Sequence, residues 1–192
     1  MTQMNKYIIF FLALVNISCA DPKALNQTES FYQGTKQINL LDNKGKKLAI
    51  GSIIFSTKNN RINYEINLEH KLFKDYFLSM KEMKCLEGPE LWCHLAYPYN
   101  NPRKITQTDL TWLSHDFLFM YKKSSEFGAN FYNGIYYDFT LESGSRLIGT
   151  AMALDLNLLA SPPEDITTPP ITIHDIDEIE LTNRWLPTIE IQ

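Results

Sequence analysis

Sulfur-containing side chains and a histidine gather between residues 80 and 94, and their types suit a soft metal ion. Met80, Met83, Cys85, Cys93 and His94 supply thioether, thiol and imidazole groups, a ligand set that Cu(I) accepts. The Cys-x7-Cys-His spacing is not that of haem attachment, and paired histidines at zinc-binding spacing are absent from the sequence. A periplasmic metal-handling protein is one hypothesis, but it requires reduced cysteines. We expect the methionines to fill a core, with no resident metal or cofactor.

Ser114, His115 and Asp116 place the residue types of a hydrolytic triad side by side. Neighbours on a helix point in different directions and cannot form the required hydrogen-bonded chain, so we expect His115 to face solvent. The sequence also lacks the G-x-S-x-G, phosphate-loop and H-E-x-x-H patterns. An envelope hydrolase therefore requires His94 or His115 to lie in a cleft beside a carboxylate. We assign no catalytic residue, and the sequence favours a non-enzymatic protein.

Four aromatic residues and one arginine are candidates for a ligand pocket. They are Tyr97, Tyr99, Arg103, Trp112 and Tyr136. The aromatic rings would line the mouth of the pocket, and the arginine would meet an anionic head group. The alternative, which the strand-forming character of aromatic residues favours, is that these rings belong to the core and to strand faces.

The N-terminus has the pattern of a secretory signal peptide over residues 1–20. Lys6 precedes an apolar run at residues 7–15 that is too short to span a bilayer. Ser18 and Ala20 suit cleavage after Ala20, whereas Ile17-Ser18-Cys19 resembles a bacterial lipobox in which Cys19 would be lipidated. We expect a periplasmic or secreted protein, or an outer-membrane lipoprotein attached to the membrane only through Cys19.

Either processing outcome removes Cys19 from disulfide chemistry. Cys85 and Cys93 are then an even pair in an oxidising compartment, so we expect a disulfide between them. Gly88 and Pro89 lie between the two cysteines and favour a turn. The stretch is predicted to be a disulfide-closed hairpin.

The composition suits one globular domain with a mildly acidic charge. Hydrophobic residues make up 44% of the chain, charged residues 21%, and the net charge is −4. Acidic residues are concentrated in the proline-rich segment 161–192, and no basic face emerges from the sequence. We therefore expect no nucleic-acid partner.

The hydrophobic pattern predicts a mainly β domain over residues 35–160, between a flexible segment 21–34 and the acidic segment 161–192. Alternating or apolar runs predict strands at 37–41, 48–56, 62–69, 72–84, 91–97, 135–142 and 147–156, and 189–191 is expected as a short anchor or edge strand. Helical spacing predicts one amphipathic helix over about 107–122. We expect a small antiparallel barrel of the lipocalin or calycin type, with a β-sandwich as the alternative.

Several short motifs resemble an uncharacterised family of secreted proteobacterial proteins. They are FLSM at 77–80, KCLEGPE at 84–90, Trp92-Cys93, Pro98-Tyr99, NGIYY at 133–137, SPPE at 161–164 and WLP at 185–187. The resemblance covers about residues 70–190. It implies export from a Gram-negative cell and supports the Cys85–Cys93 pairing, and it brings no activity.

The sequence thus favours an exported envelope protein that binds, without catalysis, a small apolar or amphipathic ligand or an envelope protein. Metal handling and hydrolysis are the alternatives.

Overall fold

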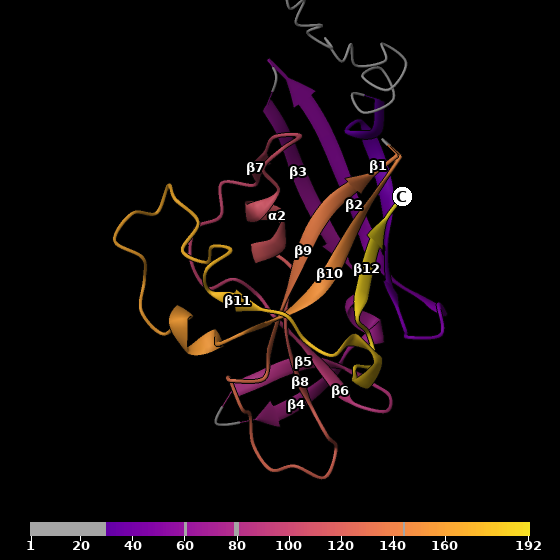
Figure 1. The fold of residues 1–192 in the computed structure, drawn as a ribbon, viewed down its shortest axis with the longest axis vertical. Coiled ribbons are helices and arrows are strands. Elements are labelled where there is room, and N and C mark those ends of the chain that lie inside the picture. The colour runs from indigo at the N-terminus through magenta and orange to yellow at the C-terminus, as the bar shows by residue number, and fades with distance from the viewer. Residues whose placement is uncertain (1–29, 60, 79–80, 144) are drawn as a thin grey trace, which may run out of the picture.

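The computed structural model describes residues 30–59, 61–78, 81–143 and 145–192, and these form one sheet of 12 strands with antiparallel pairing throughout (Figure 1). The strands are β1 (Gly34–Leu41), β2 (Lys47–Lys58), β3 (Arg61–Leu68), β4 (Lys74–Leu78), β5 (Lys81–Glu87), β6 (Leu91–Leu95), β7 (Lys104–Ile105), β8 (Leu118–Lys122), β9 (Gly134–Glu142), β10 (Arg146–Leu154), β11 (Ile176–Asp177) and β12 (Thr188–Ile191). Their order is β4-β5-β6-β8-β9-β10-β12-β1-β2-β3-β7, with β11 paired to β10.

Helical structure in the described residues is short. Besides the helical residues 30 and 31, it consists of α2 (Thr111–His115) and the 3-10 turns η1 (His70–Leu72), η2 (Leu156–Leu159) and η3 (Leu181–Asn183). None of these helices is long or apolar enough to cross a membrane. The predicted signal peptide, Cys19 and Met80 lie outside the described residues.

The larger of two apolar clusters collects alternate residues from most strands. Its members include Ile38, Leu40, Ile53, Phe55, Ile62, Trp92, Phe119, Tyr137, Phe139, Leu147, Ile189 and Ile191. Alternation puts such residues on one face of the sheet. Phe31 and Tyr32 also join this cluster by packing edge-on or tilted against Phe55. The described end of the segment 21–34 is therefore packed against the core.

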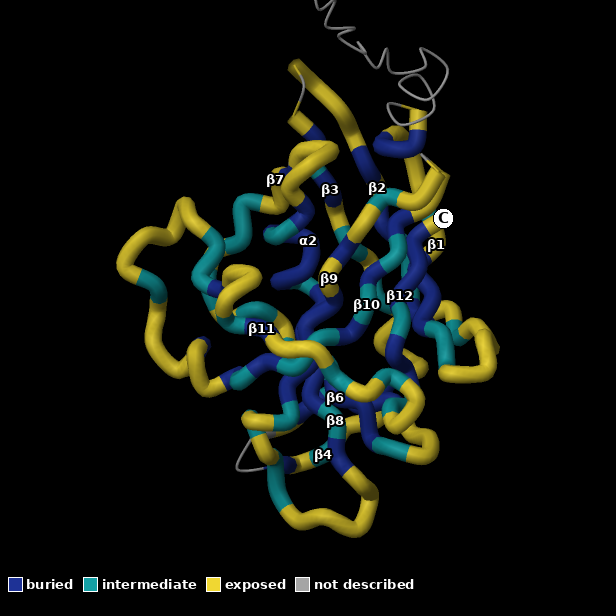
Figure 2. Tube along the Cα trace, viewed as in Figure 1, coloured by how far each residue is buried: buried dark blue, intermediate teal, exposed yellow. Residues whose placement is uncertain are grey.

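A second apolar cluster lies on the other side of β6 and β8. Trp92 and Phe119 belong to the first cluster, whereas Cys93 and Met120 belong to the second. Leu154 at the end of β10 and Leu156, Leu159, Ile171 and Ile176 from the chain after it also belong to the second cluster. Figure 2 shows the buried residues concentrated where the elements cross and the exposed positions at hairpin turns and in the loop before β11.

The prediction of a mainly antiparallel β fold is confirmed, but the sheet is not closed. Its pairing runs along an open path from β4 to β7. Closure into a barrel therefore stays unconfirmed.

The predicted disulfide-closed hairpin is present as β5 and β6. Cys85 lies directly opposite Cys93 in the strand register, and the two sulfurs are bonded at 1.98 Å. Both cysteines are fully buried in the second cluster. The bridge therefore ties together two strands at the centre of that cluster.

Two residues near the C-terminus, Arg184 and Trp185, pack against the turn of this hairpin. The indole of Trp185 lies so close to Gly88 that a Cβ atom there would overlap the ring. The Trp185 amide donates to Glu90 Oε2 at 2.9 Å, and Arg184 forms an ion pair with Glu90 at 2.9 Å. Arg184 also lies 3.9 Å from the centre of the Tyr121 ring, a cation–π contact.

The predicted helix over 107–122 is wrong for most of its length. Helix α2 spans only Thr111–His115, and residues 118–122 form strand β8 between β6 and β9. Leu118, Phe119 and Met120 are buried in succession because both faces of β8 are covered. A strand buried on both faces loses its two-residue alternation and can match helical spacing by coincidence. The predicted strand 72–84 is likewise divided between β4 and β5.

The segment 161–192 supplies two strands to the sheet. β12 was expected as an anchor or edge strand, and it lies instead between β10 and β1. The register pairs Ile38 with Ile191 on one side and Leu147 with Ile191 on the other.

Removing the disulfide with Cys85→Ala and Cys93→Ala should lower the free energy of unfolding by about 2.5 kcal/mol, because the open hairpin has more conformational freedom when unfolded. Urea unfolding of oxidised protein measures the change. Reductant should lower the stability of the parent protein and leave the alanine variant unaffected. Equal stability of the oxidised parent and the variant would contradict the prediction.

Gly88→Ala should destabilise the protein by about 1–3 kcal/mol, because the added methyl group displaces the Trp185 indole. In a Trp185→Ala background the same change should cost less than about 0.5 kcal/mol. The four unfolding free energies form a double-mutant cycle. A cost for Gly88→Ala that does not depend on Trp185 would show that the contact is not responsible.

Candidate functional site

Four of the five predicted pocket residues meet around His115. The ring of Tyr97 lies 5.7 Å from Tyr99, 6.2 Å from Trp112 and 5.2 Å from His115, measured between ring centres. Tyr136 approaches His115 from β9 at 5.8 Å. Most of these pairs are edge-to-face, an arrangement that aromatic rings favour. The rings therefore form a connected aromatic cluster whose centre is an imidazole.

His115 is fully buried, so its predicted solvent-facing position is wrong. Its Nδ1 atom lies 2.8 Å from the Thr111 carbonyl oxygen, and its Nε2 atom accepts the Ile171 N–H at 3.3 Å. This pairing requires a neutral ring with the proton on Nδ1. Burial lowers the pKa of His115, opposed by the hydrogen bond to Thr111. His115 thus fixes the segment around Ile171 to α2.

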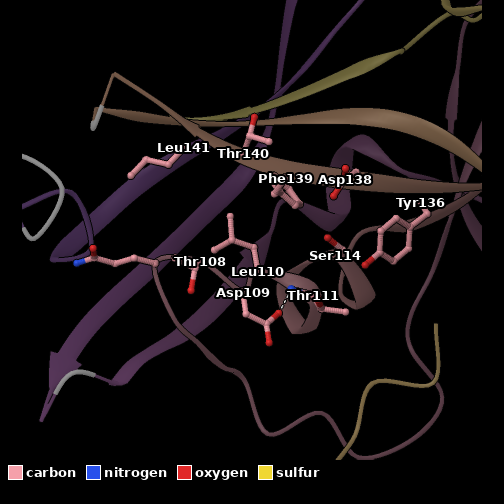
Figure 3. A pocket seen from close by; sticks show the side chains of 11 residues that line it. Thr108, Asp109, Leu110, Thr111, Ser114, Tyr136, Asp138, Phe139, Thr140 and Leu141 are labelled. Atoms are coloured by element: carbon pink, nitrogen blue, oxygen red, sulfur yellow. Dashed lines mark hydrogen bonds between the residues drawn. The ribbon is translucent and has the colours of Figure 1, made fainter. Parts of the chain in front are cut away.

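A pocket of about 510 Å³ opens between the segment 107–114 and strand β9 (Figure 3). Its lining residues are Gln107, Thr108, Asp109, Leu110, Thr111, Ser114, Tyr136, Asp138, Phe139, Thr140 and Leu141. Tyr136 connects it to the aromatic cluster. Tyr136 is thus a predicted site residue that also lines this pocket.

The lining of this pocket is amphipathic. Leu110, Phe139 and Leu141 supply apolar surface, and hydroxyl and carboxylate groups supply the rest. Two carboxylates, Asp109 and Asp138, line the pocket, and its lining contains no lysine, arginine or histidine among the residues that the structure describes. Burial raises the pKa of the Asp138 carboxyl. Burial also raises the pKa of the Tyr136 hydroxyl to about 12, so the tyrosine remains a neutral hydrogen-bonding group at physiological pH.

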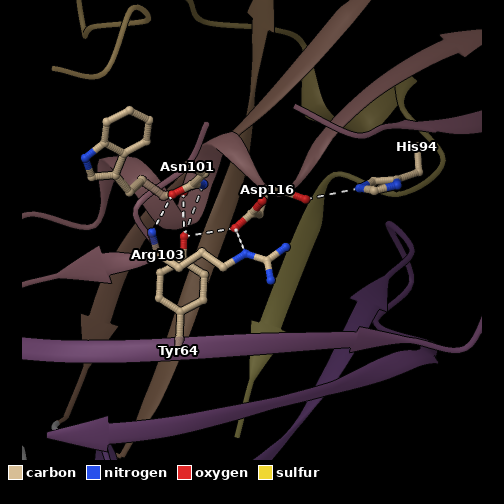
Figure 4. A network of polar contacts seen from close by, with 6 residues as sticks. Tyr64, His94, Asn101, Arg103 and Asp116 are labelled. Atoms are coloured by element: carbon tan, nitrogen blue, oxygen red, sulfur yellow. Dashed lines mark hydrogen bonds and ion pairs between the residues drawn. The ribbon is translucent and has the colours of Figure 1, made fainter. Parts of the chain in front are cut away.

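Arg103, the fifth predicted pocket residue, belongs to a separate polar network (Figure 4). Its Nε atom lies 3.6 Å from Asp116 Oδ2, and the Tyr64 hydroxyl lies 3.0 Å from the same oxygen. Asn101 Nδ2 donates to the Trp112 carbonyl at 2.9 Å, and its Oδ1 accepts the Arg103 N–H at 2.8 Å. The network joins β3, the loop before β7 and the end of α2.

The ionisable groups in and beside this network have shifted pKa values. Burial is the main reason that the pKa values of the Asp116 carboxyl and the Tyr64 hydroxyl are raised. His94 Nε2 lies 3.1 Å from the Asp116 backbone carbonyl, and burial lowers the His94 pKa. The hydrogen bonds recorded for the His94 and His115 rings thus go to backbone groups, not to a carboxylate. Within the described residues, neither ring has a recorded contact with the carboxylate that the hydrolase hypothesis requires.

A smaller apolar hollow of about 230 Å³ lies beside the aromatic cluster. Its lining residues are Leu95, Ala96, Pro98, Phe131, Leu156, Asn157, Leu159 and Ala160. The Tyr99 hydroxyl donates to the Leu159 carbonyl at 2.8 Å, which holds η2 against the loop after β6. This hollow fits a short apolar group but contains no charged side chain.

The sulfur-rich stretch does not assemble as a metal site in the described residues. Cys85 and Cys93 are bonded to each other and offer no thiolate, and Met83 is buried in the second cluster. Among the residues that the structure covers, no group of three or more His, Cys, Asp or Glu side chains is arranged to hold a metal ion.

Sequence reasoning did not identify Asp109 and Asp138 as partners in one pocket. A signal for part of the pocket was present, because Tyr136, Asp138 and Thr140 alternate with Ile135, Tyr137 and Phe139 along β9. That alternation indicates a polar strand face. The segment that lies opposite could not be inferred, because residues 107–114 were assigned to a longer helix.

Comparison of this chain with family models, with curated proteins and with solved structures gave no match.

Acidification should destabilise the protein, partly through His115. Its pKa is lowered in the folded state, so the unfolded chain takes up a proton first as the pH falls below about 6.5. The stability present above that pH is therefore lost towards pH 5. His115→Gln should reduce the slope of unfolding free energy against pH in this range, whereas His174→Gln, at an exposed position, should not. Identical slopes for the parent protein and His115→Gln would contradict this assignment.

Proposed function

We propose that this protein is an exported, non-enzymatic binding domain that holds a small amphipathic ligand in the pocket between the segment 107–114 and β9. The observation that carries the proposal is the pocket itself, whose volume of about 510 Å³ falls in the range of small-molecule sites. Its apolar and polar walls match a ligand that has both kinds of surface.

A closed barrel would hold such a ligand in its interior. In this protein the larger apolar cluster is filled by bulky, fully buried side chains, among them Trp92, Tyr137 and Phe117. The pocket instead opens at the surface, bordered by one strand and the segment before α2. We therefore place binding at this surface pocket, and barrel closure is not needed for it.

The polar end of the ligand carries positive charge in this proposal. Asp109 and Asp138 both line the pocket, and no basic side chain among the lining residues balances them. The Asp109 carboxylate already accepts the Thr111 N–H at 3.0 Å. Asp138 has no such backbone partner recorded, so it is the better candidate to pair with a cationic group on the ligand.

Export is part of the same proposal. The leader pattern at residues 1–20 supports it, and a buried disulfide suits an oxidising compartment such as the periplasm. Cleavage after Ala20 and lipidation of Cys19 are both compatible with the described fold, which begins at residue 30.

Native mass spectrometry of protein purified from its own cellular compartment tests the proposal directly. A retained small molecule that carries a basic group is the expected result. Protein that emerges without any ligand, and that is cross-linked instead to an envelope protein through a different surface, would favour the protein-partner alternative.

Asp138→Asn should weaken binding of a cationic amphiphile about tenfold, because the negative charge that attracts the cationic head group is lost. Octyltrimethylammonium below its micelle-forming concentration is a suitable probe, and calorimetry gives its affinity. Asp177→Asn, which removes the same charge at an exposed site outside the pocket, is the matched control and should leave binding unchanged. Equal binding of octyl sulfate, or equal effects of the two variants, would overturn the assigned charge preference.

A further inference from the structure

A basic hollow lies at the end of the β2–β3 hairpin beside β7. Its charge is opposite to that of the amphipathic pocket. We define it by its lining residues Lys58, Asn59, Arg61, Asn63 and Lys104, which surround about 470 Å³. All five side chains carry either a positive charge or an amide group. No carboxylate is among the lining residues that the structure describes.

The strand register explains why these side chains converge. Lys58 lies opposite Arg61 at the end of the β2–β3 ladder, and Asn63 lies opposite Lys104 of β7. Ile62 is buried in the larger cluster, so its neighbours Arg61 and Asn63 project from the other face of β3. Residues opposite each other share a face, which places all three cations on the same side of the sheet.

The three cations have no ion-pair partner within the described part of the chain. Other basic residues do, since Lys47 pairs with Glu190, Arg103 with Asp116, and Arg146 with Glu142. No ion pair is recorded for Lys58, Arg61 or Lys104 among the described residues, and the next carboxylate along β3, Glu65, does not line the hollow. The chain as a whole has a net charge of −4. The basic hollow is therefore a local concentration of positive charge in an acidic protein.

We propose that this hollow binds a phosphate group. The planar guanidinium of Arg61 can make two parallel hydrogen bonds to phosphate oxygens, and the lysines act as mobile point charges. The amides of Asn59 and Asn63 add neutral donors. A tetrahedral anion with several oxygens uses donors from several sides, which matches a site whose donors come from three strands. The volume leaves room for the molecule that carries the phosphate.

Two sources can supply this chemistry, a soluble phosphate ester and the headgroup of an anionic phospholipid. The position of the N-terminal segment favours the lipid. Thr57 Oγ1 donates to the Tyr32 carbonyl at 2.9 Å, so the chain enters the domain beside the end of β2. An anchor at Cys19, which belongs to the export proposal above, would bring this end of the domain to a membrane surface.

The test compares two triple variants of the full chain that remove the same charge. Lys58→Gln, Arg61→Gln and Lys104→Gln together alter the hollow, and Lys44→Gln, Lys46→Gln and Lys71→Gln alter exposed lysines elsewhere. Calorimetry at constant ionic strength measures binding of inorganic phosphate. Co-sedimentation measures binding to vesicles of phosphatidylcholine with and without phosphatidylglycerol.

The variant in the hollow should bind phosphatidylglycerol vesicles about 100-fold more weakly than the parent, since each basic residue contributes to attraction by an anionic surface. Its affinity for inorganic phosphate should fall at least tenfold, and the control variant should stay within about twofold of the parent for both probes. Specific binding to vesicles alone assigns the site to a lipid headgroup, and specific binding to phosphate alone assigns it to a soluble ester. Equal losses in the two variants, or no binding of either probe by the parent, would overturn the proposal.

Discussion

Burial of β6 and β8 on both faces is the constraint on which the rest of the structure depends. Trp92 and Phe119 point into one apolar cluster while Cys93 and Met120 point into the other. A strand with two apolar faces needs a cover on each side, because neither face can be left to water. One cover is the main part of the sheet. The cover on the other side comes from a part of the chain that contains no long helix or strand.

The cover of the second cluster is the segment after β10, and its attachment defines the surroundings of the pocket. Ile171 is fully buried there, and its N–H is accepted by His115 of α2. A proline-rich segment forms few backbone pairs, so a buried apolar anchor and a side-chain acceptor hold it in place. His115 in turn meets Tyr136, which also lines the amphipathic pocket. The pocket thus depends on the same contacts that close the core.

The sequence predicted elements whose pattern is local. The alternation of β3 and of the β9–β10 hairpin is visible without any partner strand, and the Cys85–Cys93 bridge follows from cysteine number and spacing. The β8 strand was mistaken for helix because two-sided burial removes alternation. The central place of β12 could not be predicted, because its register is set by residues of β1 and β10 that are distant in sequence.

The candidate site was predictable to a similar degree. Tyr97, Tyr99, Trp112 and Tyr136 were grouped as aromatic candidates. The ring of Tyr97 does approach those of Tyr99 and Trp112, and Tyr136 joins them through His115. His115, the ring at their centre, was predicted to face solvent because it was assigned to a long helix over 107–122. In the structure the helix ends at His115. Asp109 and Asp138 come from separate segments, and only tertiary packing brings them to one pocket.

The central position of β12 has a consequence for how the protein is made. Gln37 and Gln192 exchange backbone hydrogen bonds, and Ile191 bridges β1 and β10. A nascent chain therefore cannot join the two halves of its sheet until β12 has left the ribosome. Contacts between such distant segments also form slowly. Both effects delay completion of the sheet until β12 has been synthesised and has paired with its two neighbours.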